Sequence, residues 1–236
     1  MRIAVFDLDG TLSRRDLFLA FLAHAVRRMG PARPLRAATL PVLTARYALR
    51  GITNDRLKAA YLDAVLGGRT RAAVEGLAET FAERAVTREM KPAALAALQR
   101  HRRAGDRLVL ASASLDAYVA PIARRLGFDD AVATRIAWTA DGRVAGSLDG
   151  PNLRGPAKLD AVRAVIAGWG EARVTAYSDH ESDEALLAAA AEAVAVDPSP
   201  GLARIAAGRG WTVMRWGGAD DPQAAPAAGA SARGSA

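Results

Sequence analysis

The sequence predicts an α/β protein whose core is a parallel sheet between two layers of helices. Three observations support this fold class. A short apolar run at residues 2–6 ends in turn-forming residues, as a buried strand does. Residues 14–89 show a helical pattern with no strand among them. After Pro92, helical stretches alternate with short apolar runs, and such βα alternation is typical of a parallel sheet.

The order of the elements follows from breaks in these patterns. Within residues 14–89, Pro31, Pro34, Pro41 and the Gly67-Gly68 pair interrupt the helical pattern, so we expect several helices there. Beyond Pro92, helices are expected over residues 95–105, 115–127, 155–168, 182–190 and 200–210, and strands over residues 107–112, 173–178, 193–197 and 211–216.

Two further segments complete the predicted organisation. The apolar stretches 131–138 and 143–148 flank Asp141-Gly142, a dipeptide that favours two-residue loops, so we predict a β-hairpin that forms a small flap. Residues 217–236 are mostly Ala, Gly, Pro and Ser, and we expect a disordered tail. Residues 1–13 and 90–216 are then the expected core, and residues 14–89 an inserted helical cap.

The positive charge of the chain is concentrated in one segment. The formal net charge is +7, and between Asp16 and Asp55 there is no acidic residue. That segment contains six arginines: Arg27, Arg28, Arg33, Arg36, Arg46 and Arg50. It indicates a solvated basic face, a site that attracts an anionic substrate, or a surface that rests on an acidic membrane. No groove-reading motif accompanies it, so no nucleic acid is expected as a partner.

Composition also limits the chemistry. The chain has no cysteine, which excludes disulfides, thiolate metal sites and cysteine nucleophiles. The first apolar run begins at residue 2 and meets Asp7 at once, unlike a secretory leader, and no apolar stretch reaches the roughly 18 residues of a membrane span. We therefore expect a cytoplasmic protein, with a peripheral position at the inner face of the membrane as an alternative.

Polar residues cluster where the predicted strands end. Asp7 and Asp9 follow the first strand, Ser112 ends the strand 107–112, and Asp179 follows the strand 173–178. Lys158 stands at the start of a predicted helix. Because ligands of open α/β sheets bind at the carboxyl ends of the strands, we expect these side chains to converge. The set suits phosphoryl transfer.

Each residue type has a role in such a reaction. Carboxylates favour Mg²⁺, and Asp7 and Asp179 are the expected ligands. Asp7 can also act as the nucleophile, and Asp9, on the same side of an extended segment, can transfer protons. Ser112, or its neighbour Ser114, would donate a hydrogen bond to a phosphoryl oxygen, and Lys158 would supply fixed positive charge.

Four segments resemble the motifs of a known superfamily. FDLDGTL at 6–12, LVLASAS at 108–114, GPAK at 155–158 and YSDHESD at 177–183 occur in the order found in the haloacid dehalogenase (HAD) superfamily of aspartate-nucleophile phosphatases. The resemblance covers about residues 1–215. The helical insertion after the first motif, together with SASLDAYVAPIARRLGFD and TADGRVAG, is similar to subfamily IB, which includes phosphoserine phosphatases and phosphatidylglycerophosphatase-like proteins.

The resemblance implies a Rossmann-like core and a Mg²⁺-dependent phosphomonoester hydrolase that works through an aspartyl-phosphate. The implied catalytic residues are Asp7, Asp9, Ser112 and Lys158, and the implied metal site comprises Asp7, Asp9, Asp179 and Asp183. The implied substrate contacts are Thr11, Asp16, Ser112, Ala113 and Lys158. The expected substrate is a small phosphorylated molecule or a lipid-linked phosphate monoester.

The fourth motif departs from the family pattern. Ser178 replaces the usual Gly, and His180 replaces a small residue. The spacing of Asp179 and Asp183 is kept and places both carboxylates on one face of a helical turn. Ser178 and Glu181 also fit the capping-box pattern S-x-x-E, which would stabilise the helix start without any metal.

Two alternative functions remain open. Asp16 stands where phosphoserine phosphatases carry the acid that meets the substrate amine. The cap positions that should carry a substrate-binding arginine and an aromatic residue align with Asp55 and Leu62, although Arg56 and Lys58 are close. This alignment disfavours phosphoserine as the substrate. The other alternative is a membrane-surface binding or regulatory module with little turnover, suggested by the basic cap and the altered fourth motif.

Overall fold

The sheet places the end of its first strand at the centre of one edge. In the computed structural model, residues 1–217 are described, and their main sheet has six parallel strands in the order β3-β2-β1-β6-β7-β8. The strands are β1 (Arg2–Phe6), β2 (Arg107–Leu115), β3 (Asp130–Thr134), β6 (Arg173–Ser178), β7 (Glu192–Val196) and β8 (Thr212–Met214). The chain leaves β1 at the point where the strand order changes direction, which is where open α/β sheets bind ligands. The predicted parallel sheet is confirmed.

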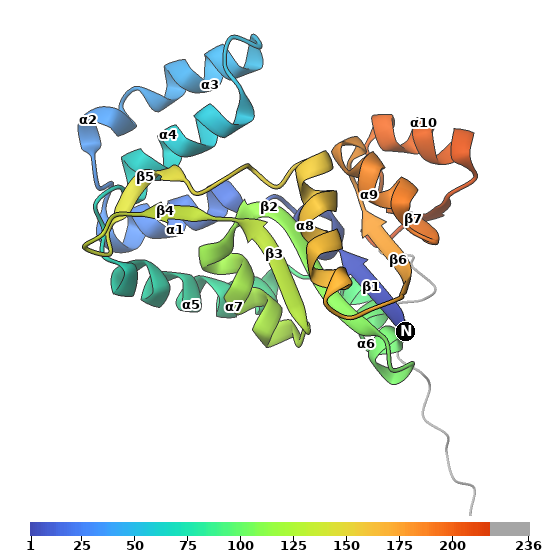
Figure 1. Ribbon diagram of the computed structural model, residues 1–236. Helices are drawn as coiled ribbons and strands as arrows, with labels where there is room; N and C mark the ends of the chain where they lie inside the picture. The colour runs from blue at the N-terminus through green and yellow to red at the C-terminus, as the bar shows by residue number, and fades with distance from the viewer. Residues whose placement is uncertain (218–236) are drawn as a thin grey trace, which may run out of the picture.

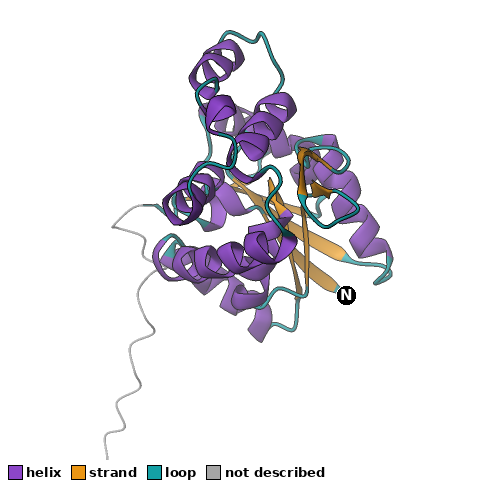
Figure 2. Cartoon of the chain, turned by 90° about the vertical axis from the view of Figure 1, so that its left-hand side faces the viewer, coloured by secondary structure: helices purple, strands orange, loops and turns teal. Residues whose placement is uncertain are grey.

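Helices cover both faces of this sheet (Figures 1 and 2). The core helices are α6 (Pro92–Arg103), α7 (Asp116–Leu126), α8 (Pro156–Ala167), α9 (Glu184–Ala189) and α10 (Pro200–Arg209). Side chains alternate between the faces of β1: Ala4 and Phe6 pack in the cluster that includes α6 and α7, whereas Ile3 and Val5 pack against α8, α9 and α10. The result is the three-layer α/β architecture that the sequence predicts.

Five helices form the insertion between β1 and α6. They are α1 (Phe18–Met29), α2 (Pro34–Ala37), α3 (Leu40–Ala48), α4 (Asn54–Leu66) and α5 (Arg71–Arg88). Backbone hydrogen bonds tie the two ends of the insertion together, from Arg14 to Glu89 at 2.8 Å and from Lys91 to Leu12 at 2.9 Å. Helix α5 runs along α7, whereas α2, α3 and α4 project away from the sheet (Figure 1). The cap boundaries at residues 14 and 89 stay a prediction.

The predicted hairpin is present, but its first strand is shorter than expected. Only β4 (Ile136–Trp138) pairs with β5 (Val144–Leu148), because residues 130–134 form β3 and extend the main sheet beside β2. The loop also differs from the predicted two-residue turn. Thr139 donates a backbone hydrogen bond to Arg143, and Gly142 closes the three-residue loop with a φ of +72°. A left-handed glycine at the end of a three-residue loop is a common alternative in hairpins.

Two expectations concern segments outside the core. Among residues 1–217, no helix has both the length and the apolar character needed to cross a bilayer. The predicted tail, residues 217–236, lies outside the described residues except for Gly217.

Candidate active site

The chain turns sharply after Asp7, and the turn needs a glycine. Gly10 has a φ of +80°, a backbone conformation that L side chains rarely adopt. A Cβ atom at Gly10 would also overlap the carboxylate of Asp179, which comes from the end of β6. The Thr11 hydroxyl donates a 3.0 Å hydrogen bond to Oδ2 of Asp7 and lies 3.4 Å from Oδ1 of Asp179. The turn therefore brings two carboxylates to one hydroxyl.

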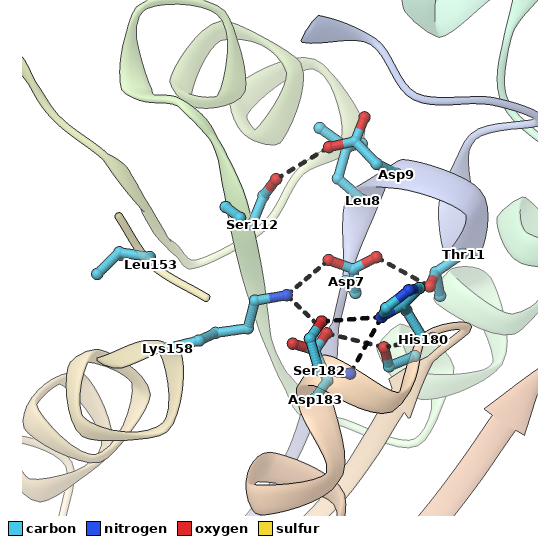
Figure 3. Close-up of polar contacts among 12 residues, drawn as sticks. Asp7, Leu8, Asp9, Thr11, Ser112, Leu153, Lys158, His180, Ser182 and Asp183 are labelled. Atoms are coloured by element: carbon cyan, nitrogen blue, oxygen red, sulfur yellow. Dashed lines mark hydrogen bonds and ion pairs between the residues drawn. The ribbon is translucent and has the colours of Figure 1, made fainter. Parts of the chain in front are cut away.

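Lys158 lies between two buried carboxylates (Figure 3). Its Nζ donates to Oδ1 of Asp7 at 2.8 Å and to Oδ2 of Asp183 at 2.6 Å, and the residue is 3% exposed. Burial opposes the ammonium charge, but the two carboxylates outweigh burial and raise the pKa of Lys158. The same lysine lowers the pKa of Asp7, although burial has the larger effect and leaves that pKa above its ordinary value. A fixed positive charge is thus held beside Asp7.

Ser178 holds Asp183 in place. The Ser178 hydroxyl donates a 2.8 Å hydrogen bond to Oδ2 of Asp183, at the end of the short helical turn Glu181–Asp183. The alternative, a capping box of Ser178 and Glu181, is not formed, because Ser178 bonds Asp183 and the Glu181 carboxylate accepts from Ser199. His180 caps the turn instead, its Nδ1 accepting from the Ser182 backbone at 3.0 Å. Ser178 therefore orients the carboxylate of Asp183.

Asp9 faces a different set of partners from Asp7. The backbone N–H of Leu17 donates to Oδ1 of Asp9 at 2.7 Å, and the Ser114 hydroxyl donates to Oδ2 at 2.6 Å. Burial raises the pKa of Asp9 to about 7, and the negative charges of Asp16 and Asp7 add to this effect. A carboxyl that titrates near neutral pH can both give and take a proton at that pH.

The two candidate serines differ in position. The Ser112 side chain is buried and points toward Asp9 (Figure 3), with its Oγ 3.3 Å from Oδ2 of Asp9. The same Oγ accepts from the Ser114 backbone at 3.0 Å. Ser114, not Ser112, is among the residues that line the cavity beside Asp9. The structure therefore brings Ser112 to Asp9, and places Ser114 in the wall of the cavity.

A cavity of about 550 Å³ opens between the sheet edge and the inserted helices. One end is polar, with Asp7, Asp9, Lys158, Asp179 and Asp183 in its wall. The other end is formed by the insertion, and it includes the acid Asp16 and a group of apolar and aromatic side chains: Phe18, Leu19, Tyr47, Leu57 and Tyr61. Ala113 also lines the cavity. The site can accommodate an anionic head group and a larger organic part.

Helix α4 contributes a cation, Lys58, to the cavity, and the sequence did not identify it as a site residue. Lys58 is buried, and its Nζ donates at 2.6 Å to the carbonyl of Ala113 and at 2.6 Å to Oδ1 of Asn152. Burial lowers its pKa to about 8, against the attraction of Asp9 and Asp16. Asp55 instead accepts from Asn152, and Leu62 is buried in the hydrophobic core, so neither lines the cavity.

Two other basic residues also belong to the surroundings of the site. Arg154 lines the cavity. Lys91 is buried under the turn, where its Nζ donates to the carbonyl of Gly10 and, at 2.9 Å, to Oδ2 of Asp197. Both were missed because an isolated Lys or Arg resembles a solvated surface residue. The contact of Lys91 with the Gly10 carbonyl therefore holds the glycine turn in position.

The residues present fit a divalent cation. Burial raises the pKa of Asp179 to about 7, and the charge of the neighbouring Asp7 adds to this effect, so a cation beside the two carboxylates would favour their ionised forms. Oδ1 of Asp183 is buried without a hydrogen-bond partner. Within residues 1–217, no three acidic or histidine side chains enclose a metal position by themselves. Mg²⁺ fits such a site, because it commonly takes one or two carboxylates and fills its shell with water and phosphate oxygens.

The predicted metal set is thus only partly assembled. Asp7 and Asp179 meet at Thr11, and Asp183 is joined to Asp7 through Lys158. The Asp9 carboxylate lies with Leu17 and Ser114 instead.

Comparison with known proteins gives the same assignment as the four motifs. The model of the haloacid dehalogenase-like hydrolases matches residues 4–188. Protein CicA of Caulobacter vibrioides is 38% identical over 192 residues, covering 80% of this chain and 83% of that protein. Phosphoserine phosphatase SerB1 of Mycobacterium tuberculosis is 33% identical over 216 residues, covering 89% of this chain and 69% of that protein.

Solved structures confirm the fold. A Bordetella pertussis protein of unknown function superposes with a TM-score of 0.76 and 30% identity, over 90% of this chain and 97% of that one. A phosphoserine phosphatase holding a phospho-aspartyl intermediate analogue superposes with a TM-score of 0.61 and 18% identity, over 91% and 92% of the two chains. With the ordered motifs on one sheet edge and a family match over most of its length, this chain belongs to the haloacid dehalogenase-like hydrolases.

Proposed function

We propose that this protein hydrolyses phosphate monoesters in two steps through a phosphorylated Asp7. The observation that carries this proposal is the ion pair between Asp7 and Lys158 at the floor of the cavity, with Asp9 beside it. Relatives named as phosphatases support the reaction class, and a phosphorylated small molecule is the expected substrate.

In the first step, a carboxylate oxygen of Asp7 forms a bond to phosphorus while the bond between phosphorus and the alcohol oxygen breaks. Asp9 gives its proton to the departing alcohol oxygen. In the second step, Asp9 takes a proton from water, whose oxygen bonds to phosphorus as the bond to Asp7 breaks. The products are the alcohol and inorganic phosphate. The pKa of Asp9, about 7, suits both transfers at neutral pH.

The surrounding residues hold charge and position. Lys158 stays charged and faces Asp7, where it can stabilise negative charge on the phosphoryl oxygens. Ser114 and Ala113 line the cavity beside Asp9, and they would contact the phosphate. Asp7 and Asp179 would hold Mg²⁺, with Asp183 supporting them. When bound, the cation supplies positive charge that offsets repulsion between the carboxylates and the phosphate.

Phosphoserine is a second candidate substrate, because the cavity contains Lys58. Its ammonium is the cap-derived cation that could meet a substrate carboxylate, and Asp16 is available for an amine. Two of the three N–H groups of Lys58 already have protein acceptors, which leaves one donor. The name of SerB1 agrees with this substrate. The described contacts give no comparable support to a lipid-linked monoester inside the cavity.

The reaction class can be tested with a generic aryl phosphate in the presence of Mg²⁺. Asp7→Asn should abolish phosphate release, whereas Asp160→Asn, which changes an exposed carboxylate on α8, should leave it unchanged. Full activity in Asp7→Asn would show that Asp7 is not the nucleophile.

A further inference from the structure

The three most exposed large apolar side chains of the described residues lie on a projecting part of the insertion, residues 33–50, which we call the tip. Leu35 of α2 is 89% exposed, Val42 near the start of α3 is 64% exposed, and Leu49, directly after α3, is 82% exposed. Single exposed apolar residues are common on protein surfaces and need no explanation. These three lie within fifteen positions of one basic segment, so they form a group, and grouped apolar residues on a surface indicate an interaction site. This tip extends away from the sheet (Figure 1).

Helix α3 has two different faces. Thr44 and Tyr47 line the cavity. Val42, Arg46 and Leu49 recur at helical spacing and are all exposed, so they share the opposite side, which we call the outer face of α3. This face combines apolar side chains with an arginine, and Arg50 follows directly.

The charge of the tip is positive after its ion pairs are counted. Arg33 and Arg36 both pair with Asp63, so one carboxylate meets two guanidinium groups. Within residues 1–217, Arg46 and Arg50 form no ion pair. The other acid of this region, Asp55, accepts a hydrogen bond from Asn152.

These observations select among possible occupants of the outer face. A second copy of the chain meeting this face symmetrically would bring Arg46 and Arg50 against their own counterparts, with no acidic side chain on the face to offset the repulsion. An acidic bilayer offers anionic head groups for the arginines and an apolar interior for the leucine and valine side chains.

We propose that the outer face of α3, together with Leu35 of α2, docks on the surface of an acidic membrane. Val42 and Leu49 enter the boundary between head groups and acyl chains, and Arg46 and Arg50 lie at the level of the lipid phosphates. Because the other side of α3 lines the cavity, docking places the cavity beside the membrane surface. The inference does not rest on the proposed catalytic reaction.

Vesicle co-sedimentation of the full chain tests this inference. Vesicles of phosphatidylcholine with one third phosphatidylglycerol should bind the protein about tenfold or more above vesicles of phosphatidylcholine alone, and added salt should weaken binding. Arg46→Gln with Arg50→Gln should reduce binding about tenfold or more, since each charge near the surface contributes on the order of 1 kcal/mol. Val42→Ser with Leu49→Ser should also reduce binding.

The controls separate docking from misfolding and from general charge. Arg103→Gln with Arg163→Gln removes the same charge from exposed positions on α6 and α8 and should bind as the unmodified protein does. Aryl phosphate hydrolysis in solution and the thermal unfolding midpoint should be unchanged in the arginine variants. Equal binding to neutral vesicles, equal loss in both arginine pairs, or a dimer that dissociates in Val42→Ser with Leu49→Ser would overturn the proposal.

Discussion

The Ser178 hydroxyl donates a 2.8 Å hydrogen bond to the carboxylate of Asp183, inside the segment YSDHESD at residues 177–183. Both residues are buried, and the same oxygen of Asp183 accepts from Lys158 at 2.6 Å. Ser178 therefore supplies a second hydrogen-bond donor to this carboxylate oxygen, which a glycine at the same position could not do.

We expect Ser178→Ala to destabilise the fold by about 1.5–3 kcal/mol, because a buried hydrogen bond to a charged group is lost. Urea unfolding would measure this difference. Ser182→Ala, which removes a hydroxyl that among residues 1–217 bonds the neighbouring His180 alone, should cost less. Equal stability in the two variants would show that the Ser178 contact contributes little.

Replacing Lys158 should affect both activity and stability. Lys158→Met leaves the buried carboxylates of Asp7 and Asp183 without their shared cation, and breaking a buried pair costs about 3–5 kcal/mol. Activity toward an aryl phosphate should be lost. Lys158→Arg keeps the charge, and should recover more stability than activity because a guanidinium has a different shape.

The stability loss in Lys158→Met should depend on pH. Burial already raises the pKa of Asp7, and removal of the lysine, which lowers it, raises it further. A carboxyl whose folded pKa lies above its unfolded value favours folding at low pH, and this contribution is lost as pH rises through the folded pKa. The unfolding midpoint of the variant should therefore approach that of the unmodified protein at pH 5 and fall behind it at pH 8. A constant difference would contradict this reasoning.

Metal binding should weaken below neutral pH. The pKa of Asp179 is raised to about 7 by burial and then by Asp7, so protons compete with Mg²⁺ for this carboxylate. We expect the dissociation constant measured by calorimetry to rise as pH falls from 8 to 6, with proton release on binding. Asp179→Asn should abolish binding. A dissociation constant that does not change with pH would argue against a role for Asp179 as a ligand.

Lys58 should determine which substrates are accepted. If its ammonium meets a substrate carboxylate, Lys58→Met will raise KM for phosphoserine much more than KM for an aryl phosphate that has no carboxylate. Arg56→Met, on the same helix but outside the cavity lining, is the matched control. An equal change in KM for both substrates would mean that Lys58 only joins α4 to β2 through the Ala113 carbonyl.

Much of the site could be predicted because parallel strands end at one edge. Asp7 and Asp179 come directly after β1 and β6, which are neighbours in the sheet, so their proximity follows from the strand pattern alone. The position of Lys158 followed from its place at the start of a helix. The orientation of Asp9 did not, since it depends on Ser114 and on the backbone of Leu17, which the turn brings together.

Other features depended on tertiary contacts that no local pattern records. Residues 131–138 look like one continuous strand, yet the chain divides them between β3 and β4 because the first part pairs with β2. In the sequence, Lys58 cannot be told from a solvated helix residue. Its role depends on the contact of α4 with the Ala113 carbonyl, which only the tertiary structure shows. The sequence from Ser178 to Glu181 also allows a capping box. In the structure Ser178 instead bonds the carboxylate of Asp183, which is buried beside Lys158, and no local pattern predicts this choice.

The central claim is that Asp7 carries the phosphoryl group, and the most direct measurement is mass spectrometry of the protein quenched in acid during turnover of a phosphate monoester with Mg²⁺. The account predicts one added phosphoryl group on the peptide containing Asp7, absent in Asp7→Asn and accumulating in Asp9→Asn if hydrolysis of the intermediate is slowed. Continued turnover by Asp7→Asn, or a phosphoryl group found on another residue, would contradict it.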